Sequence, residues 1–460
     1  MKTRKAVLLL LPAVLAGCVG VQISAERQAR NALHQLSAHF PATNDQPDLQ
    51  KSLTDASLTN FVRFALLNQP RVRAAYFDWA ATVERITVAR SLPDPQLMFE
   101  SDIADTVMTV MPGFMQMIPG PGKLNAAARV AAAESQAKYH AFESAVLQTA
   151  FDVKRIYFEL WLVEEKIKIN RETLVLLANL EHSARAQNAV GKATLRDVYR
   201  AQTERDQLAT ELADLADSRQ ALLAQFKGAL GLTREQPDPP VPAGFEPTPL
   251  DLNADDLLDT AFARNPRLRA MQAEVRLAEA NIALAHKSKV PDFSLGLMAD
   301  AKASPMMFRP LAGMTLPVWR DKIAAQIAAA QAEKHTAEAR LTSEQIMLAV
   351  DFAMKSYEYR EATRALALLQ DRLLPKARQS LELARAGYRT GQIELAGLID
   401  AERALLNFRL SEVEARARRE IVLAELSLLI AGVPPPGAPV LAGPHDVSKR
   451  SPDRSGKSEP

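Results

Sequence analysis

Hydrophobic positions recur along most of this chain with the three- and four-residue spacing of amphipathic helices. In one segment Val153, Ile156, Leu160, Val163 and Ile167 follow this spacing, which predicts a seam between packed helices. The 68 residues at positions 123–190 contain neither glycine nor proline. They therefore predict one uninterrupted helix of about 100 Å, far longer than the helices of an ordinary globular bundle.

Twice along the chain the helical spacing gives way to strict alternation of apolar and polar residues. Leu97 and Phe99 alternate with polar or soft residues, and so do Phe293, Leu295 and Leu297. These segments predict two hairpins whose strands, about nine residues long, could cross a membrane when tilted. Four strands are too few to close a transmembrane barrel, so they must be pooled between subunits or packed on protein.

The chain repeats its own plan. Leu92-Pro93-Asp94 opens the first hairpin and Val290-Pro291-Asp292 opens the second, 198 positions later. We therefore predict two structural repeats, residues 53–232 and 253–432, joined by a proline-rich linker at 233–252. Each repeat has a helix, a hairpin, a long helix and a further helix: the first has hairpin 93–119, long helix 123–190 and helix 194–230, and the second has hairpin 291–317, long helix 322–389 and helix 394–430.

The N-terminus carries an export signal. Lys2, Arg4 and Lys5 precede a short apolar run that ends in Leu15-Ala16-Gly17-Cys18. We interpret residues 1–17 as a signal peptide and Cys18, the only cysteine, as a lipid attachment site for palmitate, although a cysteine could stand there by coincidence. Residues 18–52 then predict a lipid-anchored tether with weak helical stretches, and residues 433–460 a disordered tail.

Composition and charge exclude several functional classes. The formal net charge is +2 and aromatic residues make up 6% of the chain, which gives no indication of nucleic-acid binding. The seven histidines are scattered, and no catalytic motif or phosphate-binding loop is present. We therefore expect no enzymatic activity and no cofactor.

Taken together, these features resemble the TolC family of outer membrane efflux factors. The resemblance rests on the lipobox, the duplicated plan and three segments: 118–123 (Ile-Pro-Gly-Pro-Gly-Lys), 190–198 (Val-Gly-Lys-Ala-Thr-Leu-Arg-Asp-Val) and 388–393 (Tyr-Arg-Thr-Gly-Gln-Ile), the last followed by Leu398-Ile399-Asp400-Ala401. The exit from the first hairpin is similar to the heavy-metal branch typified by CusC and CzcC. The second hairpin departs from that branch, because it ends in Leu316-Pro317-Val318-Trp319-Arg320.

The resemblance implies a mainly α fold with a small membrane β-barrel. Long antiparallel coiled-coil helices from three copies would form a periplasmic α-barrel, and four strands per protomer would build a twelve-stranded β-barrel in the outer membrane. It also implies a passive exit channel that works with a periplasmic membrane-fusion adaptor and an inner membrane pump, with heavy-metal cations as candidate substrates. The alternative is a periplasmic coiled-coil scaffold lipoprotein without a pore, which leaves the hairpins unexplained.

The helix breaks at Gly191 and Gly391 are candidate working parts. A tight turn between antiparallel helices needs a residue that adopts positive φ, as glycine does. The resemblance places these turns at the periplasmic end and implies that they contact the adaptor; the residues concerned are Val190, Gly191, Thr194, Leu195 and Gly391. Asp197 and Asp400 lie just inside the turns, as acids of the channel aperture or as partners in helix-surface salt bridges.

Nine of the thirteen methionines lie in the two hairpin regions. Thioethers suit Cu(I) or Ag(I), which makes Met98 and Met298 weak candidates for metal contact. Methionine is also simply an adaptable apolar residue. Because alternation sends only some of these side chains to each face, the sequence leaves both interpretations open.

Overall fold

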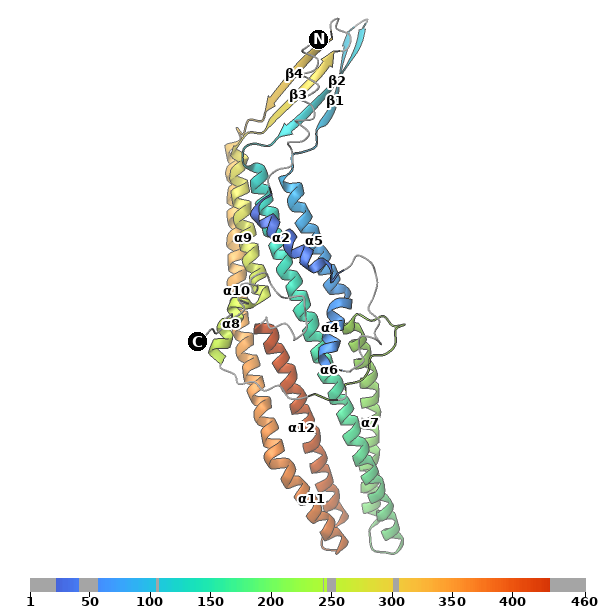
Figure 1. The fold of residues 1–460 in the computed structure, drawn as a ribbon. Helices are drawn as coiled ribbons and strands as arrows, with labels where there is room; N and C mark the ends of the chain where they lie inside the picture. The colour runs from blue at the N-terminus through green and yellow to red at the C-terminus, as the bar shows by residue number, and fades with distance from the viewer. Residues whose placement is uncertain are drawn as a thin grey trace, which may run out of the picture.

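A computed structural model describes the chain over residues 22–40, 57–104, 107–242, 244–245, 254–300 and 306–430. The molecule is elongated, with a β-sheet at one end, two turns between helices at the other, and long helices running between them (Figure 1). The prediction of a mainly helical chain with four strands is confirmed. The predicted signal peptide, Cys18 and the tail after residue 432 lie outside the described residues.

The long helix α6 (Lys123–Ala189) forms the spine of the molecule. It is uninterrupted, as expected for a segment without glycine or proline, and the side chains of its predicted seam are all buried. The helices that pack against it most extensively are α5 (Pro70–Arg90), α7 (Leu195–Leu230), α9 (Pro266–His286) and α12 (Leu395–Ile430). Because α9 and α12 come from the second repeat, α6 joins the two repeats into one body.

The shorter helices meet end to end beside the long ones. In the first repeat α4 (Leu58–Asn68) stops before Pro70, and Asn68 Nδ2 donates hydrogen bonds to the carbonyls of Leu230 and Gly231 at the end of α7, at 3.1 and 3.2 Å. In the second repeat α8 (Ala254–Arg264) stops before Pro266, and Asn265 Nδ2 donates to the carbonyl of Leu429 in α12 at 3.0 Å. These amides satisfy carbonyls that a helix end leaves without a partner, so each junction is held by the same device.

The second long helix, predicted over residues 322–389, is helical throughout but contains one wider turn that the sequence pattern did not reveal. The structure divides it into α10 (Arg320–Leu368), a π-helical segment η2 (Leu369–Leu373) and α11 (Leu374–Arg389). Pro375, the second residue of α11, has no backbone N–H to donate. The wider turn, closed by a bond from Leu374 N–H to the carbonyl of Leu369, accommodates it.

The four strands form one antiparallel sheet in the order β1-β2-β3-β4. Their bounds are β1 (Gln96–Ala104), β2 (Val107–Ile118), β3 (Phe293–Asp300) and β4 (Met307–Met314). The hairpins of the two repeats pair through β2 and β3. Within the described residues, β1 and β4 are therefore the outer edges of the sheet, each paired on one side only.

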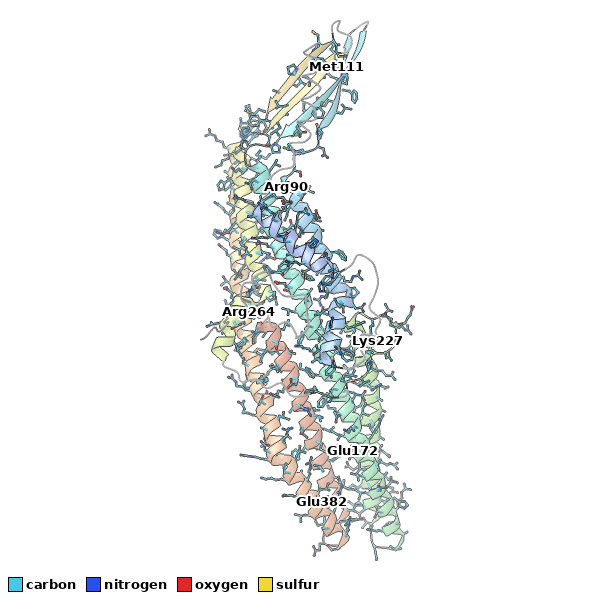
Figure 2. All side chains as sticks on the ribbon, viewed as in Figure 1. Arg90, Met111, Glu172, Lys227, Arg264 and Glu382 are labelled. Carbon is cyan, nitrogen blue, oxygen red and sulfur yellow. The ribbon has the colours of Figure 1, made fainter. Side chains whose placement is uncertain are left out.

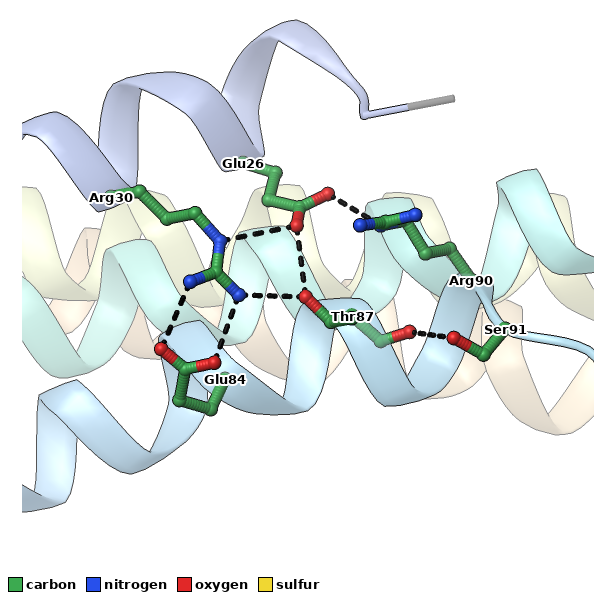
Figure 3. Close-up of polar contacts among 6 residues, drawn as sticks. All are labelled: Glu26, Arg30, Glu84, Thr87, Arg90 and Ser91. Atoms are coloured by element: carbon green, nitrogen blue, oxygen red, sulfur yellow. Dashed lines mark hydrogen bonds and ion pairs between the residues drawn. The ribbon is translucent and has the colours of Figure 1, made fainter. Parts of the chain in front are cut away.

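Part of the predicted tether packs on the helical body. Residues Ser24–Ser37 form α2, which lies across α5 near the sheet end (Figures 1 and 3). The Glu26 carboxylate is fully buried and is contacted by Thr87 at 2.9 Å, Arg90 at 2.8 Å and Arg30 at 3.2 Å. Arg30 also forms a two-pronged contact with Glu84 on α5. Burial by itself would raise the pKa of Glu26, but these hydrogen bonds hold it below its usual 4.5.

We predict that Glu26→Ala releases α2 from the body. The substitution removes the acceptor shared by three side chains, and breaking a buried ion pair costs about 3–5 kcal/mol. Amide hydrogen exchange over residues 24–37 should accelerate strongly. The matched control is Glu84→Ala, because Glu84 is largely exposed and its loss should cost about 1 kcal/mol or less.

The same contact predicts a pH dependence. Since the pKa of Glu26 is lowered in the folded chain, its contribution is present above pH 4.5 and is lost as the pH falls through the lowered value. Glu26→Ala should therefore remove the acid-induced part of the exchange at 24–37. Slow exchange in Glu26→Ala, equal to that of the unmodified protein, would contradict the role given to this carboxylate.

Candidate functional site

The two helix turns at the end opposite the sheet share one geometry. Gly191 and Gly391 have φ of 73° and 76°, the left-handed conformation that the sequence indicated. In the first turn Lys192 N–H donates to the carbonyl of Gln187, and in the second Gln392 N–H donates to that of Gly387, both at 2.8 Å. This six-to-one hydrogen bond closes the end of the preceding helix, so the glycines have a clear structural role.

Thr194 and Asp197 begin the helix that leaves the first turn. The Thr194 hydroxyl accepts from the backbone N–H of Asp197 at 3.3 Å, and the Asp197 carboxylate accepts from the backbone N–H of Thr194 at 3.0 Å. This reciprocal capping box satisfies two N–H groups at the helix start. The hydrogen bond from the Thr194 hydroxyl, followed by that from its backbone, lowers the pKa of Asp197. The carboxylate of Asp197, a candidate aperture acid, is thus hydrogen-bonded to Thr194 within its own turn.

Asp400, the other candidate acid, reaches across to the first repeat. Its carboxylate lies 2.5 Å from the guanidinium of Arg200 on α7. Nearby, Tyr388 donates from its hydroxyl to Gln187 at 3.0 Å. The sequence did not reveal the contact of Asp400 with Arg200 or that of Tyr388 with Gln187. In each pair the two residues lie about 200 positions apart, and no local pattern marks them. The contacts bind the two turns together within one chain.

The two turns differ in what they expose. In the first, the apolar side chains Val190, Leu195 and Tyr199 are 68%, 54% and 59% exposed. In the second, Leu395 stands where Leu195 stands in the first, yet it is 4% exposed because it packs with Ile399 against α6 and α7. The first turn therefore presents an apolar surface that the second turn lacks.

Charged contacts hold the repeats together above the turns. Arg409 on α12 lies 2.7 Å from Glu172 on α6, and Lys166 lies 2.5 Å from Glu414. Figure 2 marks Glu172 and Glu382 in this part of the helical body. Most of these groups are partly exposed, so they fix the register of neighbouring helices more than they add to stability.

The sheet has two chemically different faces, which the strand register defines. Directly opposed residues share a face, and so do residues two apart along a strand. We call one the apolar face; among the residues whose side chains are described, it carries Leu97, Phe99, Pro112, Phe114, Gln116, Ile118, Phe293, Leu295, Leu297, Ala299, Phe308, Pro310, Ala312 and Met314. Among these described side chains Gln116 is the one polar member. Leu97, Phe99 and Phe308 are more than half exposed, as isolated soluble sheets rarely allow.

The opposite face, which we call the polar face, carries charged and amide side chains together with methionines. Its polar members are Gln96, Glu100, Ser294, Asp300 and Arg309, and Asp300 pairs with Arg309 at 3.7 Å. Six of the nine hairpin methionines stand on it: Met98, Met111, Met115, Met117, Met298 and Met307. The candidates Met98 and Met298 thus share a face and, with Gly113 between them, a single cross-strand row.

Asp292 joins the two hairpins to the helices. Its carboxylate accepts from the backbone N–H of Gly120 at 2.8 Å and from Lys123 Nζ at 2.7 Å. Its backbone N–H donates to the Thr315 hydroxyl, also at 2.8 Å. The Pro-Asp that opens the second hairpin therefore holds the Pro-Gly-Lys exit of the first, two motifs that the sequence showed separately.

Two further observations limit the chemistry of the chain. In the part of the chain that the structure describes, no helix is both long and apolar enough to span a membrane. Within the same residues, no group of three or more histidine, cysteine, aspartate or glutamate side chains could hold a metal ion.

Comparison with known proteins gives consistent matches. The family described as "Outer membrane efflux protein" matches residues 62–232 and 257–432, well over half of the chain. The cobalt-zinc-cadmium resistance protein CzcC of Cupriavidus metallidurans is 24% identical over 378 residues, which cover 79% of this chain and 84% of that protein.

Solved structures share the fold. A membrane protein from Pseudomonas aeruginosa matches with a TM-score of 0.74 and 19% identity, covering 84% of this chain and 93% of that one. The structure of CusC, described in terms of folding and transmembrane channel formation, matches with a TM-score of 0.72 and 17% identity, covering 85% and 98%. At these identities the likeness concerns the fold alone.

Proposed function

Because this chain belongs to the outer membrane efflux protein family, we propose that three copies of it form one channel that serves as the passive exit duct of a tripartite efflux system. Outer membrane efflux is the function of the family, and the relatives are channel or efflux proteins, not enzymes. The finer points proposed here are the trimer, the barrel, the partners and the substrate.

The exposed apolar face of the sheet is the observation that carries the proposal. It combines several large exposed side chains with two strand edges, β1 and β4, that are paired on one side only. Exposed edges of this length invite aggregation unless another chain covers them. Pairing β4 of one copy with β1 of the next would close a barrel of twelve strands from three copies, with the apolar face toward lipid and the polar face inward. A pore-free scaffold would leave this face unexplained.

A stripe on α10 supports the same assembly. Ile346, Met347, Val350, Met354 and Tyr357 are all about half exposed or more and fall on one side of that helix. In a three-fold ring each copy offers one surface to the copy ahead and a different one to the copy behind. We propose that the next copy covers the α10 stripe, which continues the β4-to-β1 contact down the helical body.

The duplication indicates where neighbouring copies meet. The offset of 198 residues between the repeats makes Asp94 the counterpart of Asp292. The same offset makes Val318 the counterpart of Gly120. Within the chain Asp292 holds Gly120. In a ring of alternating repeats, Asp94 of the neighbouring subunit should lie near Val318. Val318 and Trp319 are 63% and 74% exposed in the single chain, as this arrangement requires.

A cysteine pair tests this assembly. Cys18 is the only natural cysteine, so Asp94→Cys combined with Val318→Cys should give oxidised dimers and trimers on a non-reducing gel. Each single substitution is a control, and so is Asp94→Cys with Leu383→Cys, whose second site lies at the far end of the molecule. Oxidation that yields only monomer from the Asp94 and Val318 pair would contradict the ring.

We propose that Cys18 is acylated, which would anchor the chain to outer membrane lipid just before α2. The docking of α2 across α5 then sets where that anchor lies relative to the sheet end. The anchor and the barrel would hold the same end of the molecule at the membrane, with the helical body reaching into the periplasm.

We further propose that the helix turns at the opposite end bind the periplasmic adaptor. Val190, Gly191, Thr194, Leu195 and Gly391 belong to these turns, and the exposed apolar side chains of the first turn provide a surface that a partner could bury. At this end Asp197 accepts a hydrogen bond in the capping box, and Asp400 forms an ion pair with Arg200. The substrate class proposed from the likeness to CzcC is metal cations, delivered by an inner membrane pump.

A further inference from the structure

Four methionines surround Gly113 on the polar face of the sheet. Met98 on β1 and Met298 on β3 are the cross-strand partners of Gly113, and Met111 and Met115 lie two residues before and after it on β2. All four therefore project from the same face. With neighbouring strands about 4.8 Å apart, the backbones of β1 and β3 are separated by roughly 10 Å across Gly113, a gap that two methionine side chains can span.

The missing side chain of Gly113 opens the space between them. A Cβ placed on Gly113 would lie 2.6 Å from Cγ of Met298. The Met298 side chain therefore already extends over Gly113, on the polar face that also carries Met98. Met298 and Met111 are buried, whereas Met98 and Met115 are partly exposed. Solvent can therefore reach the cluster from the side of Met98 and Met115.

The chemistry of this cluster is that of a soft ligand set. Thioethers are uncharged, do not take up protons in the ordinary pH range, and select Cu(I) and similar soft ions over Zn(II) or Co(II), which favour nitrogen, oxygen or thiolate ligands. Glu100 is the cross-strand partner of Met111, and Asp300 lies two residues from Met298 on the same face. Asp300 is paired with Arg309, which is the cross-strand partner of Met298, so its charge is largely offset. Glu100 is the carboxylate that favours the approach of a cation, and it does so without filling the space over Gly113.

The alternative is that these methionines only fill an apolar surface. The distribution of side chains argues against it. The aliphatic and aromatic residues of the sheet stand almost entirely on the apolar face, and the methionines share the other face with carboxylates, an amide and an arginine. Met314 stands on the apolar face and is 54% exposed, which supplies a natural control.

We propose that Met98 and Met298 form a thioether site for a soft monovalent cation, Cu(I) or Ag(I), over Gly113, once in each chain, with a third sulfur supplied by Met111 or Met115. The inference rests on the proposed function, since it narrows the exported substrate to soft monovalent ions and assumes that the polar face lines the exit path. Binding there would have to be weak enough for release, as conduction along a pore requires.

Silver ion is the probe. The full-length protein, purified as its detergent-solubilised assembly, is titrated with Ag(I) by calorimetry, and bound silver is counted by equilibrium dialysis. One Ag(I) per chain is expected, with no retention of Zn(II) or Co(II). Met98→Leu and Met298→Leu keep the apolar volume and remove a sulfur, and each should weaken binding by about tenfold or more, as losses at metal sites do.

Two variants separate the site from general effects on the sheet. Met314→Leu should bind Ag(I) as the unmodified protein does. Gly113→Ala should weaken binding although no sulfur is removed, because its methyl group displaces Met298. The inference fails if the unmodified protein binds no Ag(I), if Met98→Leu and Met298→Leu bind normally, or if Met314→Leu weakens binding equally.

The proposed function is measured separately on the same preparations, as assembly state and conductance in planar bilayers. A conducting trimer that binds no Ag(I) would remove the methionine site and leave the channel. A monomer without conductance that still binds Ag(I) would remove the channel and leave the site.

Discussion

Replacing Gly191 or Gly391 with valine is expected to abolish efflux while the protein still reaches the outer membrane as a trimer. Both glycines have positive φ, which strains a β-branched residue by about 1–2 kcal/mol. A Cβ atom at either position would meet nothing within 4 Å, so the helices, the sheet and the contacts between the turns should be untouched. The damage is then confined to the shape of the turn and the surface that it presents to the adaptor.

The measurements are efflux-dependent metal tolerance in a host that lacks its own channel, trimer in outer membrane extracts, and in vivo cross-links from Thr194 to the adaptor. Gly228→Val is the matched control, because Gly228 also has open space around it but lies within α7. Gly191→Asn and Gly391→Asn should restore much of the function, since asparagine tolerates positive φ. Normal tolerance and undiminished cross-links in both valine variants would leave these turns with a structural role only.

Val350→Glu combined with Met354→Glu is expected to convert the trimer to monomer and so to remove efflux completely. Both side chains are about half exposed on α10, where they belong to the stripe that we propose the next copy covers. Burying two carboxylates in that contact without partners costs several kcal/mol, whereas in the single chain they would remain in water. Sedimentation of the detergent-solubilised protein reports the assembly directly.

Folding of the single chain is the control for this variant. Its helix content should match that of the unmodified protein, and Gln331→Glu, which adds a charge to an exposed position on α10 away from the stripe, should remain trimeric. If the double variant sediments as a trimer, the α10 stripe does not lie between copies, and the ring must be closed by other surfaces.

The two turn glycines could be recognised from the sequence, whereas the role proposed for Val350 and Met354 could not. Gly191 and Gly391 could be identified in advance, because each interrupts a long helical pattern and a tight reversal needs positive φ. Val350 and Met354 could not be assigned to a contact between copies, since helical periodicity marks an apolar position equally whether it is covered by the same chain or by another.

Local patterns determined the elements of this protein. The three- and four-residue spacing and the absence of glycine and proline predicted the bounds of α6 almost to the residue. Alternation predicted the strands, and it assigned Leu97 and Phe99 to one face of the sheet and Met98 to the other. The π-helical turn at Leu369–Leu373 lies next to Pro375, and the spacing of apolar residues did not reveal it. All of these features depend on residues a few positions apart, which is the range that a sequence pattern describes.

Only the tertiary structure decided which distant residues meet. The register of β2 on β3 brings Met298 over Gly113, and a shift of one residue would have sent it to the apolar face. Packing between repeats buries Leu395 and leaves its counterpart Leu195 exposed, although the two occupy equivalent places in the sequence. Glu26 likewise acquires its role when α2 docks on α5. Such pairings depend on how whole elements pack, so residues identical in type and local pattern can end in different surroundings.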